Sequence, residues 1–283
     1  MNATAANVTV LGLDPSAQVQ APVVVDLAGV TKIYETASGD HVHALKNINL
    51  ALGAGEFVSV VGASGCGKTT LLRIIGGLEG EYQGKLSLHG RAAASSRQNV
   101  GIVFQDANLL PWRNILQNVL LPTQVLRLDK RASIARAREL IELVGLKGFE
   151  DKYPFELSGG MRQRVSIARA LVHDPAVLLM DEPFGALDAL TRETMNAEVL
   201  KIWEATGKTV FMITHSIAEA VFMSDRVIVM SPRPGRVIAE RRISLPRPRS
   251  LDLLSDEKFG SYTREIRHLL DSSGTSTDSK VSS

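Results

Sequence analysis

The stretch GASGCGKTT, residues 62–70, has the glycine spacing and the Lys-Thr ending of a phosphate-binding loop. It follows the apolar run EFVSVVG and precedes the helical pattern TTLLRIIGGL, which is the strand, loop and helix context that the motif requires. Glycines let the backbone curl, so that its N–H groups and the helix N-terminus face bound phosphates. The residues predicted to cradle phosphates are Gly62, Ala63, Ser64, Gly65, Cys66, Gly67, Lys68, Thr69 and Thr70.

Two side chains of this loop have specific predicted tasks. Lys68 is expected to reach the β- and γ-phosphates of a nucleotide, and the Thr69 hydroxyl is expected to bind Mg²⁺. Cys66 is the single cysteine of the chain, so an internal disulfide is excluded and a reducing compartment is the simplest setting. Its backbone is expected to serve the loop; the alternative is a reactive thiol whose pKa is lowered by Lys68 and the helix N-terminus.

A pair of carboxylates ends a second apolar run, VLLMDEP. Asp181 and Glu182 are expected at the tip of a buried strand, where water is scarce. A carboxylate at such a tip holds Mg²⁺, and a second one beside it polarises the attacking water. We therefore predict that Asp181 is a metal ligand and that Glu182 is the general base.

Two further polar side chains follow apolar runs. His215 ends TVFMITH, so its imidazole is expected level with Glu182 across adjacent strand ends, where it would contact the γ-phosphate. Gln105 follows GIVF and is a neutral candidate ligand for Mg²⁺ or its water. An ordinary loop position is the alternative for Gln105.

The segment LSGGMRQR, residues 157–164, is a second anion-binding pattern in the same chain. Ser158 is predicted to cap the helix that follows, because its side chain can accept a hydrogen bond from a free backbone N–H. Gly159 and Gly160 permit close approach of backbone, and the helix N-terminus adds positive potential. The alternative is an ordinary helix cap with a solvated basic helix.

The elements that must position these residues follow an α/β pattern. The runs at 56–62, 176–183 and 209–215 are predicted as central parallel strands of a P-loop core, since they suit strands buried on both faces. Partial alternation at 23–35, 41–53 and 84–90 predicts a small flanking antiparallel sheet. Residues from about 107 to 165 have a helical period and no strong strand, which predicts an inserted helical subdomain.

Composition bounds the class of protein. The 283 residues suit one functional unit, and the 45% apolar and 22% charged shares are ordinary for a globular protein. The formal net charge of +2 gives no overall attraction to nucleic acid or anionic lipid. No apolar run is long enough to span a membrane, and the N-terminus lacks the basic region of a secretory signal, so the chain is expected in the cytoplasm.

The two ends of the chain have a different composition. Residues 1–22 are small and polar without a sustained period and are predicted to be disordered, followed by one nucleotide-binding domain at 23–246. Residues 247–283 are predicted to hold a C-terminal helix and a disordered tail that begins at about 271. Arg241, Arg242, Arg247 and Arg249 are expected to form a solvated surface run, with contact to anionic lipid as the alternative.

The order of these motifs resembles the ATP-binding cassette of ABC transporters, over about residues 24–240. That resemblance implies ATP and Mg²⁺ as cofactors, Tyr34 in TKIYE as the aromatic platform for adenine, and Asp188 in GALD as a residue of the cassette interface. It also implies that Ser158, Gly159 and Gly160 bind the ATP held by a second copy of the chain. By this resemblance, the phosphate loop and the segment 157–164 of one chain belong to two different ATP sites, each completed by the second copy.

The segments FQDANLLPWRNILQNV, FGALDALTRETM and VIVMSPRPGRV are similar to importer ATPases for nitrate, aliphatic sulfonates and taurine, a group that includes transporters of thiamine precursors. This implies an integral membrane permease that docks near Gln105 and Trp112, a periplasmic solute-binding protein as an indirect partner, and a peripheral place on the cytoplasmic face of the inner membrane. A cassette ATPase that acts on DNA or ribosomes, and a P-loop kinase, are the alternatives. No nucleic-acid partner is expected.

Overall fold

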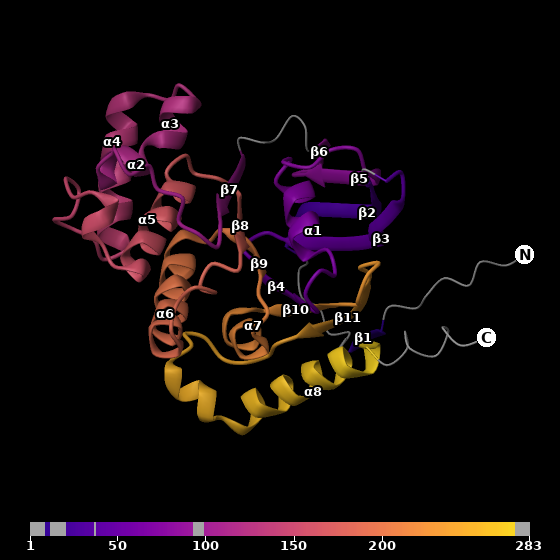
Figure 1. Cartoon of the computed structure of the whole chain (residues 1–283). Coiled ribbons are helices and arrows are strands. Elements are labelled where there is room, and N and C mark those ends of the chain that lie inside the picture. Colours follow the sequence, from indigo (N-terminus) through magenta and orange to yellow (C-terminus); the bar gives the residue numbers. More distant parts are fainter. Residues whose placement is uncertain (1–8, 12–20, 37, 93–98, 275–283) are drawn as a thin grey trace, which may run out of the picture.

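A computed structural model describes residues 9–11, 21–36, 38–92 and 99–274 of the chain (Figure 1). The described residues form a central seven-stranded sheet, a separate four-stranded sheet and a group of helices set to one side. The central sheet has the order β1-β11-β10-β4-β9-β8-β7. Its strands are β1 (Thr9–Leu11), β4 (Phe57–Gly62), β7 (Val100–Val103), β8 (Val177–Asp181), β9 (Thr209–Ile213), β10 (Arg226–Met230) and β11 (Val237–Arg242).

The three predicted core strands are neighbours in this sheet. β4 pairs in parallel with β9, and β9 pairs in parallel with β8. β7 adds a further parallel strand beside β8. The prediction of a parallel P-loop core is confirmed, and the carboxyl ends of β4, β8 and β9 meet at one edge of the sheet.

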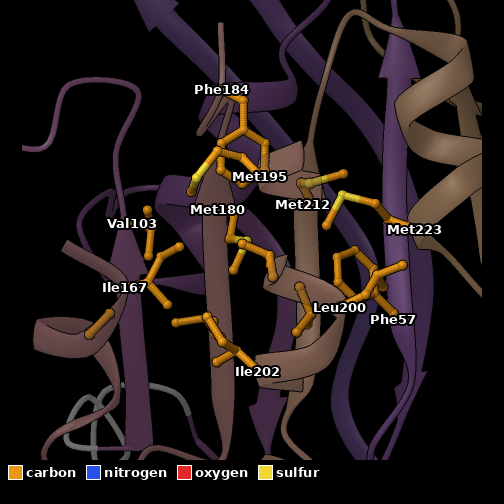
Figure 2. Packing of buried hydrophobic residues seen from close by; sticks show 14 of the residues in the cluster. Phe57, Val103, Ile167, Met180, Phe184, Met195, Leu200, Ile202, Met212 and Met223 are labelled. Atoms are coloured by element: carbon orange, nitrogen blue, oxygen red, sulfur yellow. The ribbon is translucent and has the colours of Figure 1, made fainter. Parts of the chain in front are cut away.

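Strand alternation divides the apolar residues between two cores. Leu178, Met180 and Met212 point to one face, where they pack with residues of the surrounding helices (Figure 2). Leu179 and Phe211, one residue removed, point to the opposite face and join a second core. Because side chains of a strand alternate between faces, a continuous apolar run is what a sheet covered on both sides requires.

The second sheet covers this opposite core. It has the order β3-β2-β5-β6, with β2 (Val23–Glu35), β3 (His41–Gly53), β5 (Gln83–Leu88) and β6 (Arg91–Ala92) all antiparallel to their neighbours. The predicted flanking antiparallel sheet is therefore confirmed. Helix α1 (Lys68–Ile75) shares the core between the two sheets, since its leucines and isoleucines pack with strands of both.

The helices of the predicted insertion form the lobe at the upper left of Figure 1. They are α2 (Ile115–Val119), α3 (Leu121–Val125), α4 (Lys130–Leu143), the short η3 (Pro154–Glu156) and α5 (Gly159–Leu171). α4 buries Ala137, Leu140 and Ile141, whose spacing places them on one helical face, in agreement with the helical period predicted for this segment. α5 leads back to the sheet and continues six residues beyond 165.

Strand β1 corrects one prediction. Within the segment 1–22 that we expected to be disordered, Thr9–Leu11 pair in parallel with Ala239–Arg241 of β11. The exposed edge of β11 offers unpaired backbone groups, and three residues of extended chain satisfy them. Residues 1–8 and 12–20 of that segment lie outside the described part of the chain.

The C-terminal region packs against the core. Helices α6 (Ala189–Thr206) and α7 (Ile217–Met223) precede β10, and η4 (Leu251–Ser255) leads into α8 (Glu257–Gly274), which lies along the lower side of the molecule in Figure 1. α8 continues through Asp271, so the tail predicted from 271 begins later; residues 275–283 lie outside the described part. No helix among the described residues has the length and apolar character needed to cross a membrane.

The four arginines predicted as a solvated run differ in exposure: Arg242 is exposed, Arg241 and Arg247 are partly buried, and Arg249 is buried. Arg249 is buried and donates to the carbonyls of Val221, Phe222 and Ser224, where α7 ends. Burial lowers its pKa to about 10. Arg247 pairs with Asp225 at 2.8 Å. Both expectations for Arg249, solvation and lipid contact, are wrong, because the free carbonyls of a helix C-terminus bind its guanidinium.

Candidate nucleotide-binding and catalytic site

The phosphate loop connects β4 to α1 at the carboxyl edge of the central sheet. Gly67 is the N-cap of α1 with φ of 99°, and a Cβ there would lie 2.8 Å from the carbonyl oxygen of Ala44. Only glycine fits this backbone. Lys68 donates to the carbonyls of Gly62 at 2.9 Å and Ala63 at 3.0 Å, so its ammonium is held within the loop.

The adjacent strand ends bring the predicted catalytic residues together. The Thr69 hydroxyl donates to Oδ1 of Asp181 at 3.2 Å, and Nδ1 of His215 lies 3.2 Å from Oε2 of Glu182. The predicted level placement of His215 and Glu182 is therefore confirmed as geometry. Glu182 has φ of 45°, a left-handed backbone that is uncommon outside glycine, and such strain clusters at functional sites.

The electrostatics of this edge suit a cation. Burial raises the pKa of Asp181, and the neighbouring Glu182 charge raises it further, whereas the Thr69 hydroxyl lowers it. A divalent ion beside the oxygens of the Thr69 hydroxyl and the Asp181 carboxylate would favour the ionised form of Asp181. A hydroxyl and a carboxylate oxygen are also the hard ligands that Mg²⁺ prefers, so Thr69 and Asp181 fit this metal.

A cavity of about 420 Å³ lies between the phosphate loop and the side chains of Glu182 and His215, and Asp181 is not among the residues that line it. Its lining includes Lys68, Glu182 and His215. Tyr34, expected to stack on adenine, lines the same cavity from β2, and its hydroxyl donates to Glu79 at 3.1 Å. Five of the residues predicted in the loop line it as well: Ser64, Gly65, Gly67, Thr69 and Thr70.

The second anion-binding pattern lies in a different cavity. Ser158 and Gly160 line a space of about 460 Å³ together with Leu190, and neither lines the cavity of the phosphate loop. The Ser158 hydroxyl accepts from the N–H of Met161 at 3.3 Å, which confirms the predicted cap of α5. Within one chain, the structure does not combine this pattern with the phosphate loop.

Two more predicted site residues also lie outside the nucleotide cavity. Gln105 is exposed after β7, and a Cβ on Gly185 would lie 3.3 Å from its amide nitrogen. Asp188 is exposed and caps α6 by accepting from the N–H of Thr191 at 3.0 Å. The hydrogen bonds from Thr191 lower the pKa of Asp188, so this carboxylate stays charged at neutral pH.

Sequence reasoning missed Arg233, which also lines the nucleotide cavity. It belongs to the turn between β10 and β11, and those two strands were not predicted from the sequence. The signal was present as two apolar segments around SPRPGR, a hairpin pattern rich in turn residues.

Cys66 is buried below the loop, and this burial raises the pKa of its thiol. The alternative of a lowered thiol pKa is therefore wrong, because removal from water outweighs the nearby Lys68.

We predict that a disulfide reagent such as DTNB labels the folded protein slowly at pH 8 and reacts promptly after unfolding in guanidinium. Prompt labelling of the native chain would contradict this. Bound nucleotide should slow the reaction further.

A phosphate loop at the edge of a parallel sheet, with an acidic pair and a histidine at the neighbouring strand ends, defines a P-loop nucleoside triphosphatase. The model of the family described as "ABC transporter" matches residues 45–185. The chain belongs to this family, as an ATP-binding protein that hydrolyses ATP for transport. This assignment takes the place of the P-loop kinase alternative.

Curated relatives support the assignment along most of the chain. An uncharacterized ABC transporter ATP-binding protein of Methanocaldococcus jannaschii is 50% identical over 85% of this chain and 89% of its own length. The taurine import ATP-binding protein TauB of Burkholderia pseudomallei is 46% identical over 77% and 84%. The aliphatic sulfonates import ATP-binding protein SsuB of Bacillus cereus is 42% identical over 86% and 94%.

Solved structures agree with the fold. A dimeric ATP-binding cassette in a post-hydrolysis state, bound to ADP and phosphate, matches with a TM-score of 0.67 and 36% identity over 78% of this chain and all of that one. The cbiO1 protein of Clostridium perfringens, part of the ABC transporter complex cbiONQ, matches with a TM-score of 0.71 and 25% identity over 88% and 99%. The architecture of this chain is therefore that of an ABC cassette.

Proposed function

We propose that this chain is the ATPase subunit of an importer for a small anionic or zwitterionic solute of the nitrate, sulfonate or taurine class. The observation that carries the proposal is the identity of 42–46% to relatives named for taurine and aliphatic sulfonate import, over 77–86% of this chain. Import of thiamine precursors is the second candidate, from the resemblance of the sequence.

The site residues have the following proposed roles. Lys68 and the backbone N–H groups of the loop hold the β- and γ-phosphates of ATP. Thr69 and Asp181 would hold Mg²⁺, with Gln105 as a further ligand once it turns toward the site; bound there, the ion neutralises phosphate charge. Glu182 accepts a proton from the attacking water.

Three other residues complete the proposed site. His215 donates to the γ-phosphate, and its position beside Glu182 supports this role. Tyr34 stacks on adenine, which is supported by its place in the nucleotide cavity. Asp188 lies at the contact between two cassettes, supported by its exposure at the start of α6.

A second copy of the chain is the proposed partner across the nucleotide. Ser158, Gly159 and Gly160 then bind the γ-phosphate of the ATP held by the partner copy, which is supported by the separate cavity that Ser158 and Gly160 line and by the dimeric cassettes among the related structures. Contacts made only in the closed dimer shift the equilibrium toward closure. Hydrolysis removes the bridging phosphate, and the dimer reopens.

Mechanical work requires attachment to a separate integral permease, because the described residues contain no helix able to span a membrane. We place the chain at the cytoplasmic face of the inner membrane, peripherally bound, with a periplasmic solute-binding protein as an indirect partner. Trp112, which precedes α2 of the helical lobe, is 72% exposed, which supports a docking surface there.

An uptake assay tests this function. The chain is expressed with a permease and a solute-binding protein of a taurine or sulfonate importer, in cells that lack their own sulfonate and taurine uptake. Labelled taurine, an alkanesulfonate, nitrate and a thiamine precursor are supplied in turn. Uptake of a member of the first three, abolished by Lys68→Ala, is the expected result. Uptake of the thiamine precursor alone, or uptake independent of Lys68, would overturn the assignment.

A further inference from the structure

The turn between β10 and β11, residues 231–236, is fixed against the phosphate loop. A Cβ on Gly235 would lie 2.0 Å from the carbonyl oxygen of Cys66, so only glycine permits this approach. The N–H of Gly235 donates to Ala44 at 3.0 Å, and the N–H of Lys46 donates to Gly235 at 2.9 Å. These contacts tie the turn to the loop and to β3 at the same time.

Arg233 extends from this turn over the phosphate loop. Its Nε and Nη2 donate to the carbonyl of Gly65 at 3.3 and 3.2 Å, and both Arg233 and Gly65 line the nucleotide cavity. Its Nη1 has no hydrogen-bond partner among the described residues, and the residue is exposed. The guanidinium is therefore anchored on one side and keeps free N–H groups on the other.

The positive charge of the Arg233 guanidinium at this position suits it to bind an anion. The residues that line the nucleotide cavity include two basic side chains, Lys68 and Arg233. Lys68 is 7% exposed and bonded to loop carbonyls, whereas Arg233 faces solvent at the mouth. A planar guanidinium with free N–H groups binds phosphate oxygens by charge-assisted hydrogen bonds.

We propose that Arg233 is a further nucleotide-binding residue, which contacts the phosphates of the bound nucleotide from the mouth of the cavity. The proposal rests on ATP binding by the cassette and is independent of the imported solute. It differs from a purely structural role, in which Arg233 only fixes the Gly65 carbonyl. A phosphate contact makes the effect depend on nucleotide charge and on salt; a structural role does not.

Equilibrium binding to the full chain tests the proposal. ATP, ADP, AMP and adenosine compete with a fluorescent ATP analogue at low and high salt, for the parent chain, Arg233→Ala, Arg233→Lys and Arg236→Ala. Arg236 is the matched control, since it is an exposed arginine of the same turn that does not line the cavity. Thermal unfolding without nucleotide shows whether each variant is folded.

Arg233→Ala is expected to bind ATP about tenfold more weakly, the loss of roughly one charge-assisted hydrogen bond. The loss should shrink from ATP through AMP to adenosine, and the salt dependence of ATP binding should become shallower. Arg233→Lys should restore the salt dependence, and Arg236→Ala should match the parent chain. Unchanged ATP affinity in Arg233→Ala, or an equal loss for all four ligands with unchanged salt dependence, would overturn the proposal.

Discussion

Glu182→Gln is expected to lower ATP turnover by at least about 100-fold, the lower range of a general-base contribution, and to leave ATP binding intact. The amide keeps the shape of the side chain and its hydrogen bond to His215, but it cannot take a proton from the attacking water. ATP then stays in place, and the variant should accumulate as an ATP-bound dimer. Steady-state phosphate release and size-exclusion chromatography with ATP measure the two effects.

Two control variants show whether the loss of turnover is specific to the proposed base. Lys68→Ala should fail earlier in the cycle, with weak nucleotide binding and no ATP-dependent dimer. Glu139→Gln makes the same chemical change at an exposed residue whose contact is a surface ion pair with Arg136, and should turn over like the parent chain. Undiminished phosphate release by Glu182→Gln would remove Glu182 from the role of base.

The backbone adds a reason to expect a large effect at this position. Glu182 has φ of 45°, and its N–H donates to the carbonyl of Ile213 at 2.9 Å, which extends the pairing of β8 and β9 beyond the last strand residue. A left-handed residue persists only where its surroundings determine it. The fold therefore fixes the backbone that carries this carboxylate in the lining of the nucleotide cavity.

Sequence patterns predicted the parts of the fold that obey local rules. β4, β8 and β9 are mostly apolar runs, because a strand whose two faces are both covered needs apolar residues at nearly every position. Since carboxyl ends of parallel strands meet at one edge, the shared cavity of Lys68, Glu182 and His215 followed from the same rule. The antiparallel sheet could also be predicted, because strands with one buried and one exposed face alternate apolar and polar residues in their sequence.

The missed features depend on contacts that are distant in sequence. β1 forms only because β11 offers an edge, and Thr9–Leu11 are too few to show a period. Arg249 resembles any surface arginine until the end of α7 is placed beside it, 25 to 28 residues away. Arg233 enters the nucleotide cavity through a turn that packs on the loop 168 residues earlier in the chain.

Ser158→Arg is expected to abolish turnover and to leave ATP binding by a single chain unchanged. Ser158 caps α5 at an exposed position, so the change costs about 1 kcal/mol of stability from the lost cap, which a folded domain tolerates. The added side chain fills the cavity that Ser158 shares with Gly160 and Leu190, where the partner's ATP would dock. Ser158→Ala removes the cap without the bulk and serves as the matched control for stability.

A double variant separates closure from chemistry. Glu182→Gln alone is expected to accumulate as a closed dimer, so addition of Ser158→Arg should return it to the monomer at the same ATP concentration. Sedimentation velocity measures this directly, and nucleotide binding by both proteins should stay within about twofold. A dimer that persists in the double variant would show that the segment 157–164 takes no part in closure.

Mixing two inactive chains then reports where each half of a site comes from. Ser158→Arg retains an intact phosphate loop, and Lys68→Ala retains an intact Ser158. If a site combines the loop of one chain with Ser158 of the other, a mixed dimer contains one undamaged site beside one that carries both changes. ATP turnover of the mixture above the sum of the separate proteins is expected, because a site built within one chain would be broken in every molecule present. Full turnover by Ser158→Arg alone would contradict the shared site from the start.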